Sequence, residues 1–270
     1  MMTKFLASLA AFTALTAAAS AADLPRRAAP PPVFTPVPVF TWTGAYFGIN
    51  AGYITSTKDS VRSAGVLTAN TGIADGNRPA VLPLPQSGFT GGGQIGYNWQ
   101  ITPGSGLVVG IEADAAYTDM SQTRGVVGTN GGISVYRQSM DYLGTVRGRV
   151  GYAIDRTLVY ATGGFAYAGM NYTGVYATAA GVPSFIGNRS RTDTGWAAGG
   201  GIEYALPTDS FLNFFRSSAV TVKAEGLYYD LGQHTVPLVA VGPGRGGYVS
   251  RFQNEGVLGR VGINYKFGSY

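Results

Sequence analysis

The sequence predicts an all-β protein, an eight-stranded antiparallel transmembrane β-barrel that follows a signal peptide and a proline-rich periplasmic tether. One reason is a series of segments of about ten residues with alternating polarity. A second is the alternation of long and short connections between those segments. The third is the composition: 41 glycines and 17 tyrosines in 270 residues, with 12% charged residues, which resembles neither an ordinary soluble domain nor a disordered chain.

The first part of the chain predicts export from the cytoplasm. Residues 1–21 combine Lys4, an uncharged run and a small-x-small pattern, Ala-Ser-Ala, at residues 19–21, as in a secretory signal peptide. The run is shorter than the ~20 apolar residues of a spanning helix. The chain has no cysteine, so we expect a closed structure, rather than disulfides, to stabilise the exported protein.

Residues 22–41 are rich in proline and predict an extended, polyproline-like tether, with a docking peptide for a partner as the alternative. Residues 42–270 are assigned to the barrel domain. The formal net charge of the whole chain is +5. Removal of Lys4 with the signal peptide leaves about +4, which is too modest to indicate nucleic acid as a partner.

The first three strands are expected at residues 44–55, 89–101 and 107–117. In each segment, aromatic and aliphatic side chains alternate with glycine and polar side chains. One face of each strand is therefore apolar and the other is polar or small. The inward face of the third segment carries Glu112 and Asp114.

A hairpin within residues 140–169 supplies the next two strands, with a short polar break at residues 154–157. Its first run, residues 142–152, has an apolar face with a tyrosine at each end, whereas Arg147 and Arg149 lie on the opposite face. The rise of this run is roughly 33 Å, and a tilt of about 40° leaves roughly 25 Å across a membrane. That height matches the apolar band of an outer-membrane barrel. The second run has no clearly polar face, so its register remains open.

The last three strands are expected at residues 195–206, 219–231 and 255–267. Their alternation places aromatic and aliphatic side chains outward. Charged side chains fall on the inward faces: Glu203, Lys223, Glu225, Arg260 and Lys266.

The connections between these strands alternate in length. The long ones are residues 56–88, 118–139, 170–194 and 232–254, and the short ones are residues 102–106, 154–157 and 207–218. This asymmetry predicts long loops on the cell surface and short turns in the periplasm, with both termini in the periplasm. A ten-stranded sheet would result if residues 211–216 or part of the first long connection also paired.

The inward-facing charges are the group most easily taken for an active site. An eight-stranded barrel is just wide enough for side chains to fill it, so we expect these groups to pair as a network across the lumen. A conducting or gating role is the alternative. The network residues are Glu112, Asp114, Arg147, Arg149, Glu203, Lys223, Glu225, Arg260 and Lys266.

Basic residues outnumber acidic ones in the expected surface loops. Lipopolysaccharide phosphates lie at that surface, and arginine binds phosphate in bidentate fashion. We therefore expect outer-membrane lipid and lipopolysaccharide as partners, with ordinary solvated loop charge as the alternative. The candidate contacts are Arg189, Arg191, Arg245 and Arg251.

Other motifs give weaker indications. Residues 91–96 match G-x-G-x-x-G, but a strand-like segment follows instead of a helix, so no phosphate-binding loop is expected.

His234 could supply an axial nitrogen to haem iron, or act with a serine such as Ser250 in a lipid-modifying enzyme. No orienting acid or oxyanion site accompanies that pair. The sequence therefore predicts no catalytic site, no metal and no cofactor.

Five segments carry a resemblance to a known family: residues 42–48, 143–152, 160–164, 228–232 and 260–267. They resemble the small outer-membrane β-barrel proteins of alphaproteobacteria, porin-like surface proteins with an OmpA-type eight-stranded fold. The resemblance implies an integral, surface-exposed outer-membrane protein that contributes to envelope integrity and has no chemistry of its own. Because some relatives are credited with haem binding or weak porin activity, a narrow channel or a ligand-binding surface barrel is the alternative.

The same resemblance implies insertion by the barrel-assembly machinery, which reads an aromatic residue at the end of the last strand. Here residues 268–270 follow Phe267. Phe267 and Tyr270 are therefore both candidates for the assembly signal.

Overall fold

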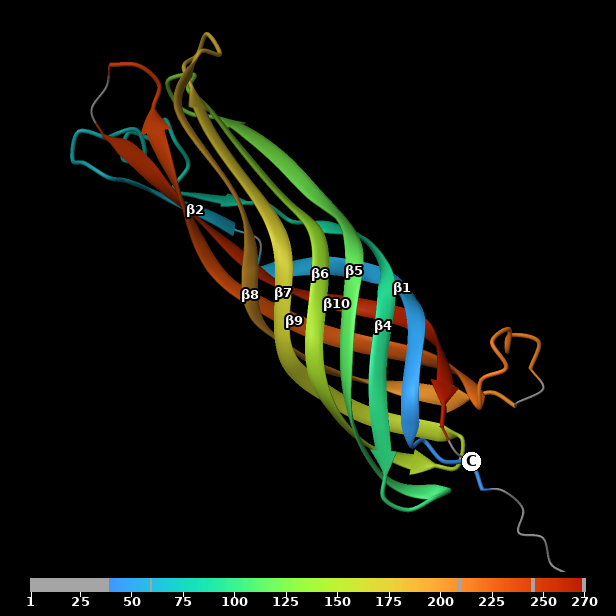
Figure 1. Ribbon diagram of the computed structural model, residues 1–270. Coiled ribbons are helices and arrows are strands. Elements are labelled where there is room, and N and C mark those ends of the chain that lie inside the picture. Colours follow the sequence, from blue (N-terminus) through green and yellow to red (C-terminus); the bar gives the residue numbers. More distant parts are fainter. Residues whose placement is uncertain (1–38, 59, 208–209, 244–245, 269–270) are drawn as a thin grey trace, which may run out of the picture. The chain divides into compact units, whose positions relative to one another are not determined.

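The computed structural model describes residues 39–58, 60–207, 210–243 and 246–268. In these residues the chain is all-β, and one antiparallel sheet closes into a barrel (Figure 1). The described part contains no helix that is long and apolar enough to cross a membrane. The predicted signal peptide, nearly all of the predicted tether and Tyr270 lie outside the described residues.

Eight strands form the ring of the barrel, each antiparallel to its neighbours. Pairing of the first with the last closes the ring, so that Ala51 lies opposite Gly91 on one side and Val261 on the other. Near the base, where every ring strand is paired on both sides, no strand edge is left with unpaired backbone groups. The prediction of an eight-stranded antiparallel barrel is thus confirmed. The ring consists of β1 (Gly44–Lys58), β4 (Ser87–Gln100), β5 (Ser105–Val127), β6 (Ile133–Ile154), β7 (Thr157–Ala177), β8 (Pro183–Ala205), β9 (Ala219–Ala240) and β10 (Gly247–Phe267).

Two short strands come from the first predicted connection. β2 (Ser60–Gly65) pairs with β10, and β3 (Val81–Pro83) pairs with β2. The sheet of the described residues therefore has ten strands, as the ten-strand alternative allowed, although the ring has eight. Residues 211–216 form no strand.

The prediction of long surface loops after the third, fifth and seventh ring strands is largely wrong. Strands β5 and β8 each contain 23 residues, and the β5–β6 and β7–β8 connections are short turns at residues 128–132 and 178–182. A strand of about 22 residues rises about 70 Å, more than twice the apolar band of a membrane. We call the part beyond that band, residues 60–86, 120–140, 170–194 and 231–254, the head. The opposite rim, where β4, β6 and β8 end, is the base.

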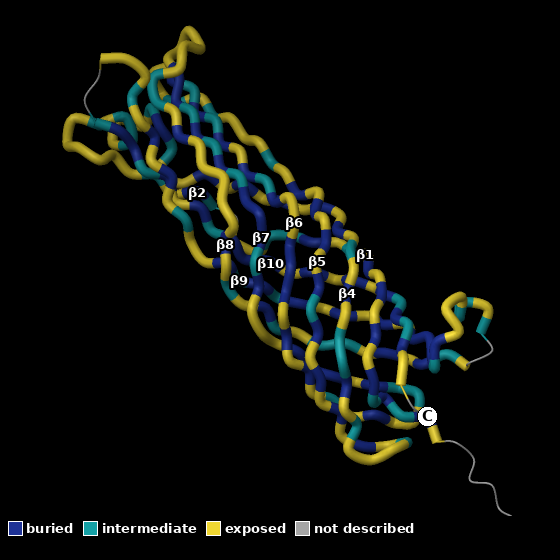
Figure 2. Tube along the Cα trace, in the orientation of Figure 1, coloured by how far each residue is buried: buried dark blue, intermediate teal, exposed yellow. Residues whose placement is uncertain are grey.

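Alternate residues face outward and inward along the strands, as expected from their polarity (Figure 2). Ile49 and Ile95 on the outer wall are 67% and 63% exposed, whereas the inward Glu112 and Arg147 are 2% and 1% exposed. The register of β7, which the sequence left open, places Tyr160 inward, where it is buried.

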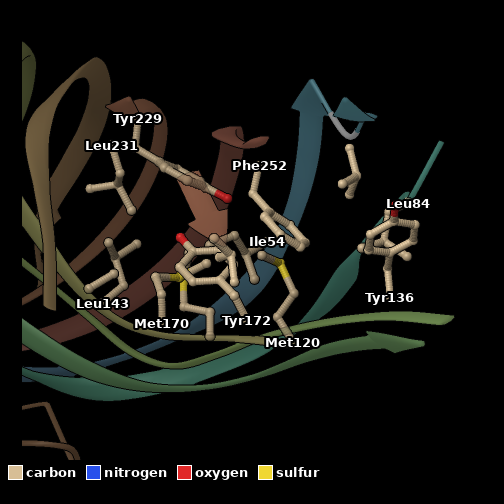
Figure 3. Packing of buried hydrophobic residues seen from close by; sticks show 14 of the residues in the cluster. Ile54, Leu84, Met120, Tyr136, Leu143, Met170, Tyr172, Tyr229, Leu231 and Phe252 are labelled. Atoms are coloured by element: carbon tan, nitrogen blue, oxygen red, sulfur yellow. The ribbon is translucent and has the colours of Figure 1, made fainter. Parts of the chain in front are cut away.

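The interior of the barrel has three layers between base and head. An apolar cluster at the base includes Phe40 and Trp42, and the indole of Trp42 donates a hydrogen bond to the carbonyl of Asp155 (3.1 Å). The charged side chains occupy the middle layer. Above them, a second apolar cluster fills the head with residues such as Met170 and Phe252 (Figure 3).

The segment between β2 and β3 joins the strand ends of the head. The buried guanidinium of Arg78 donates to the carbonyl of Ile133 (2.7 Å) and lies 4.8 Å from the ring centroid of Tyr176. The side-chain oxygen of Asn77 accepts a hydrogen bond from the amide of Gly132 (3.0 Å). Both hairpin ends, β5–β6 and β7–β8, are therefore tied to this segment.

Candidate functional site: the charge network in the lumen

Five ring strands bring charged side chains together in the middle layer. Because side chains two positions apart share a face, each strand contributes one or two groups at neighbouring levels. Eight of the nine predicted residues meet here, with four carboxylates and four cations. They are Glu112 and Asp114 of β5, Arg147 and Arg149 of β6, Glu203 of β8, Lys223 and Glu225 of β9, and Arg260 of β10.

Glu112 lies at the centre of the network. Its carboxylate is 2.7 Å from Nη2 of Arg147 and 2.9 Å from Nζ of Lys223. Arg149 and Arg260 lie farther away, at 3.4 and 3.5 Å. One carboxylate thus faces four cations, which only strand pairing and ring closure bring together.

Arg260 joins two further carboxylates. Its Nη1 and Nη2 donate to the two oxygens of Asp114 at 2.8 and 3.1 Å, a bidentate pair. The same guanidinium contacts Glu225, with Nη2 2.6 Å from Oε1. Arg147 also binds both carboxylates, at 3.0 Å from Asp114 and 3.2 Å from Glu225.

Two tyrosines that were not predicted to belong to the network complete it. The hydroxyl of Tyr46 donates to Glu112 (2.8 Å) and accepts from Nη1 of Arg149 (2.7 Å). Tyr160 donates to Glu225 (2.9 Å), and the guanidinium of Arg149 lies 3.9 Å from the centroid of its ring. This position permits a cation–π interaction. The alternation already placed Tyr46 inward, and this was the available signal.

Lys266 does not join the network, which corrects the prediction. It faces the lumen and is buried, but its Nζ lies 5.8 Å from the ring centroid of Phe40 in the apolar cluster of the base. Lys266 lies opposite Tyr46, two residues nearer the base than Asn264. Asn264, and not Lys266, donates to Glu203 (2.9 Å).

The charged groups of the network are buried and paired with one another. Its eight charged side chains are at most 6% exposed and all are paired with groups of opposite charge. A groove of about 430 Å³ lies instead on the outer wall, lined by residues that include Phe47, Ile95 and Val146. A buried network whose members are paired with one another fills the lumen at this level and makes it rigid.

A second cluster, around Asp193 in the head, was missed because residues 170–194 were taken for a loop. Asp193 is fully buried, and its carboxylate contacts Nε of Arg191 (2.7 Å), Nε2 of His234 (3.2 Å) and Nδ2 of Asn254 (3.0 Å). Tyr172 also donates to it. The one histidine of the chain is therefore the partner of a buried carboxylate.

His234 and Ser250, the pair considered above for a lipid-modifying enzyme, contact different groups. The buried hydroxyl of Ser250 lies 2.9 Å from that of Ser63. His234 lies against Asp193 and the carbonyl of Leu231, at 3.1 Å. Residues 91–96, with the G-x-G-x-x-G match, lie within β4.

The predicted lipopolysaccharide contacts lie on the strands of the head. Arg189 and Arg191 are exposed on β8, where its pairing with β9 is interrupted between Ile186 and Trp196. Arg251 is exposed on β10 and lies directly opposite Arg62 of β2. Arg245 lies outside the described residues.

Comparison with known proteins agrees with this architecture. Residues 7–267 match the family described as outer membrane protein beta-barrel domain. The 31 kDa outer-membrane immunogenic protein of Brucella melitensis biotype 1 is 35% identical, and the alignment covers 99% of this chain and 100% of that protein. The 22 kDa outer membrane protein of Rhizobium leguminosarum bv. viciae is 28% identical, with 65% and 66% covered. The crystal structure of OprG from Pseudomonas aeruginosa has a TM-score of 0.51 at 14% identity, with 84% and 97% covered, which is a likeness of fold.

Proposed function

The chain belongs to the outer membrane protein beta-barrel family, and we propose on this premise that it is a structural surface protein that contributes to envelope integrity. It is an integral protein of the bacterial outer membrane. In the proposal, the head stands on the cell surface, and the barrel has no chemistry of its own. The observation that carries the proposal is a lumen filled from base to head.

The charge network supports a structural barrel over a channel. Solute passage needs a continuous wet path, whereas the middle layer consists of buried ion pairs with apolar clusters on both sides. Breaking a buried pair leaves an uncompensated charge, so side chains in such a network do not swing aside easily. A narrow channel is the second candidate, because side chains of the two apolar clusters and of the charge network, and no inserted backbone segment among the described residues, fill the ring.

Recordings in planar bilayers test this proposal. The refolded protein should show no stepwise conductance. The double variant Arg147→Gln with Arg149→Gln weakens the pairing of all four carboxylates and should admit water and open a measurable conductance. Lys266→Met, which removes a lumen cation outside the network, should stay silent. Regular conductance steps from the unaltered protein would show that it is a channel instead.

The arginines of the head support lipopolysaccharide as a partner. Arg62 and Arg251 lie directly opposite each other on neighbouring strands, an arrangement that is destabilising for like charges without an anion between them. Arg189 donates to the carbonyl of Thr235 (3.3 Å), and Thr235 lies opposite Arg251. Arginines of three strands thus lie at one level of the head, where the phosphates of lipopolysaccharide could bind them.

Lipopolysaccharide that co-purifies with the barrel measures this interaction. Arg62→Gln with Arg251→Gln should lower the bound amount severalfold, because two arginines that could bind one phosphate are lost. Arg216→Gln removes an exposed cation at the base and is the control. Equal amounts of lipopolysaccharide on all three proteins would argue for ordinary solvated charge.

A further inference from the structure

The connection between β8 and β9 at the base is unlike a water-facing turn. Residues 210–218 of this connection contain three exposed phenylalanines. Phe211 is 83% exposed, Phe214 is 74% exposed and Phe215 is 59% exposed. Three such rings within five residues form an apolar surface of the kind that marks an interaction site. The structural role proposed above does not use this surface.

Aromatic contacts place this segment against the outer wall and not over the lumen. The ring of Phe215 packs edge-on against Phe47 (5.7 Å between centroids) and Tyr265 (4.7 Å). Both partners point outward, from β1 and β10. The hydroxyl of Tyr265 also donates to the carbonyl of Leu212 (3.1 Å). In Figure 1 the orange segment accordingly projects sideways from the barrel near the base.

Local hydrogen bonds shape the segment. The side-chain oxygen of Asn213 accepts from the amide of Ser217 (2.8 Å), and its Nδ2 donates to the carbonyl of the same residue (3.0 Å). The amide of Asn213 donates to the carbonyl of Ser210 (3.0 Å). Arg216 closes the turn with a φ of 48°. The phenylalanines are therefore carried by a double turn that these hydrogen bonds stabilise.

The aromatic residues beside the segment indicate what covers it. Phe47 stacks on Phe267 (5.5 Å between centroids) and packs against Tyr265 (5.8 Å). These rings belong to the outer wall near the base, where outer-membrane barrels carry an aromatic girdle at the lipid–water boundary. Phe215 extends this row of rings, and Phe211 and Phe214 are more exposed than Phe215.

We propose that residues 210–216 form a membrane foot, which inserts Phe211 and Phe214 into the phospholipid leaflet next to the base. The foot widens the contact of the barrel with lipid beyond its own wall. Phospholipid is the occupant because the foot is continuous with the lipid-facing girdle. A soluble partner at this place would have to displace the lipid that already covers β1 and β10.

Spin labels test the foot directly, because the chain has no cysteine and each introduced cysteine is a unique labelling site. Phe211→Cys and Phe214→Cys would be labelled and refolded into vesicles of phosphatidylethanolamine and phosphatidylglycerol. Thr129→Cys in the β5–β6 turn is the water control, and Ile95→Cys on the outer wall is the lipid control. The readout is the ratio of collision rates with oxygen and with a water-soluble nickel chelate.

Both foot labels should show an oxygen-to-nickel ratio severalfold above that of the label at residue 129 and approaching that at residue 95. A ratio equal to the water control would overturn the proposal. Protection from both reagents would also overturn it, because the rings would then be covered by protein. Both positions are exposed, so the barrel should fold in each variant, and the shift in gel mobility between heated and unheated samples checks this.

Discussion

The membrane-embedded part of the barrel and the head fill their interiors by opposite means. In the membrane-embedded part, from Lys58 toward the base, the outer wall is apolar and the lumen holds the charge network. In the head an apolar cluster of methionine, leucine and aromatic side chains fills most of the interior beside the Asp193 cluster (Figure 3), whereas exposed strand positions carry arginines such as Arg137 and Arg189. Along the same strands, the placement of apolar and charged side chains is thus reversed where the barrel leaves the membrane.

The surrounding solvent explains this inversion. Lipid requires apolar outward side chains, so in the membrane part polar groups can lie only in the lumen, where they must satisfy one another. Water around the head removes that requirement, and burial of apolar side chains then stabilises the interior as in a soluble protein. The comparison implies that substitutions should affect the two parts by different mechanisms.

The largest effect is expected for Arg147→Met in the charge network. This change leaves Glu112, Asp114 and Glu225 each without one cation and should lower the free energy of unfolding by about 3–5 kcal/mol. Urea unfolding in lipid vesicles measures it. The matched control is Lys266→Met, which breaks no ion pair of the network and should leave stability unchanged or slightly higher. An equal loss in both variants would mean that the ion pairs are unimportant.

A smaller and local effect is expected for Leu238→Ala in the head. Leu238 is 1% exposed within the apolar cluster, and the cavity should cost about 2–4 kcal/mol. Because the membrane part has its own network, limited proteolysis should cut the head while the strands below remain protected. Val239→Ala, at an exposed neighbouring position, is the control. Uniform loss of protection along the barrel would show that the two parts unfold as one unit.

The smallest effect is expected from alkaline pH, and again in the head. Burial raises the pKa of Tyr172 and of Tyr136 above the usual value of about 10. Above pH ~10 the unfolded chain therefore loses protons that the folded head retains, and stability falls as the pH rises. Proteolysis of the head should increase between pH 9 and 11.

The variant Tyr172→Phe with Tyr136→Phe removes both titrating groups and should weaken this dependence on pH. The variant also loses hydrogen bonds, including that from Tyr172 to Asp193, and this loss is equal at neutral and alkaline pH. The readout is therefore the slope of the proteolysis rate against pH and not the rate itself. An unchanged slope would show that these tyrosines do not titrate with unfolding.

Sequence alternation predicted the membrane part well and the head poorly. In lipid the outward residues must be apolar, so period two is strong, and it located Glu112, Arg147 and the other inward charges. The extension of β8 into the head gives no such pattern, since residues 188–192 are exposed at every position. A strand segment with both faces in water resembles a loop in sequence, which is why this extension and the Asp193 cluster beside it were missed.

The sequence by itself determined the barrel fold, the lipid-facing side of most strands and the set of charged side chains in the lumen. Each of these follows from the local alternation of side chains. Tertiary structure alone decided the partners. Arg260 reaches Asp114 across 146 residues, and Lys266 is left beside Phe40, because strand stagger and ring closure set which levels of the lumen meet. Tertiary structure also decided that pairing continues into the head, where backbone hydrogen bonds hold strands whose sequences carry no periodic signal.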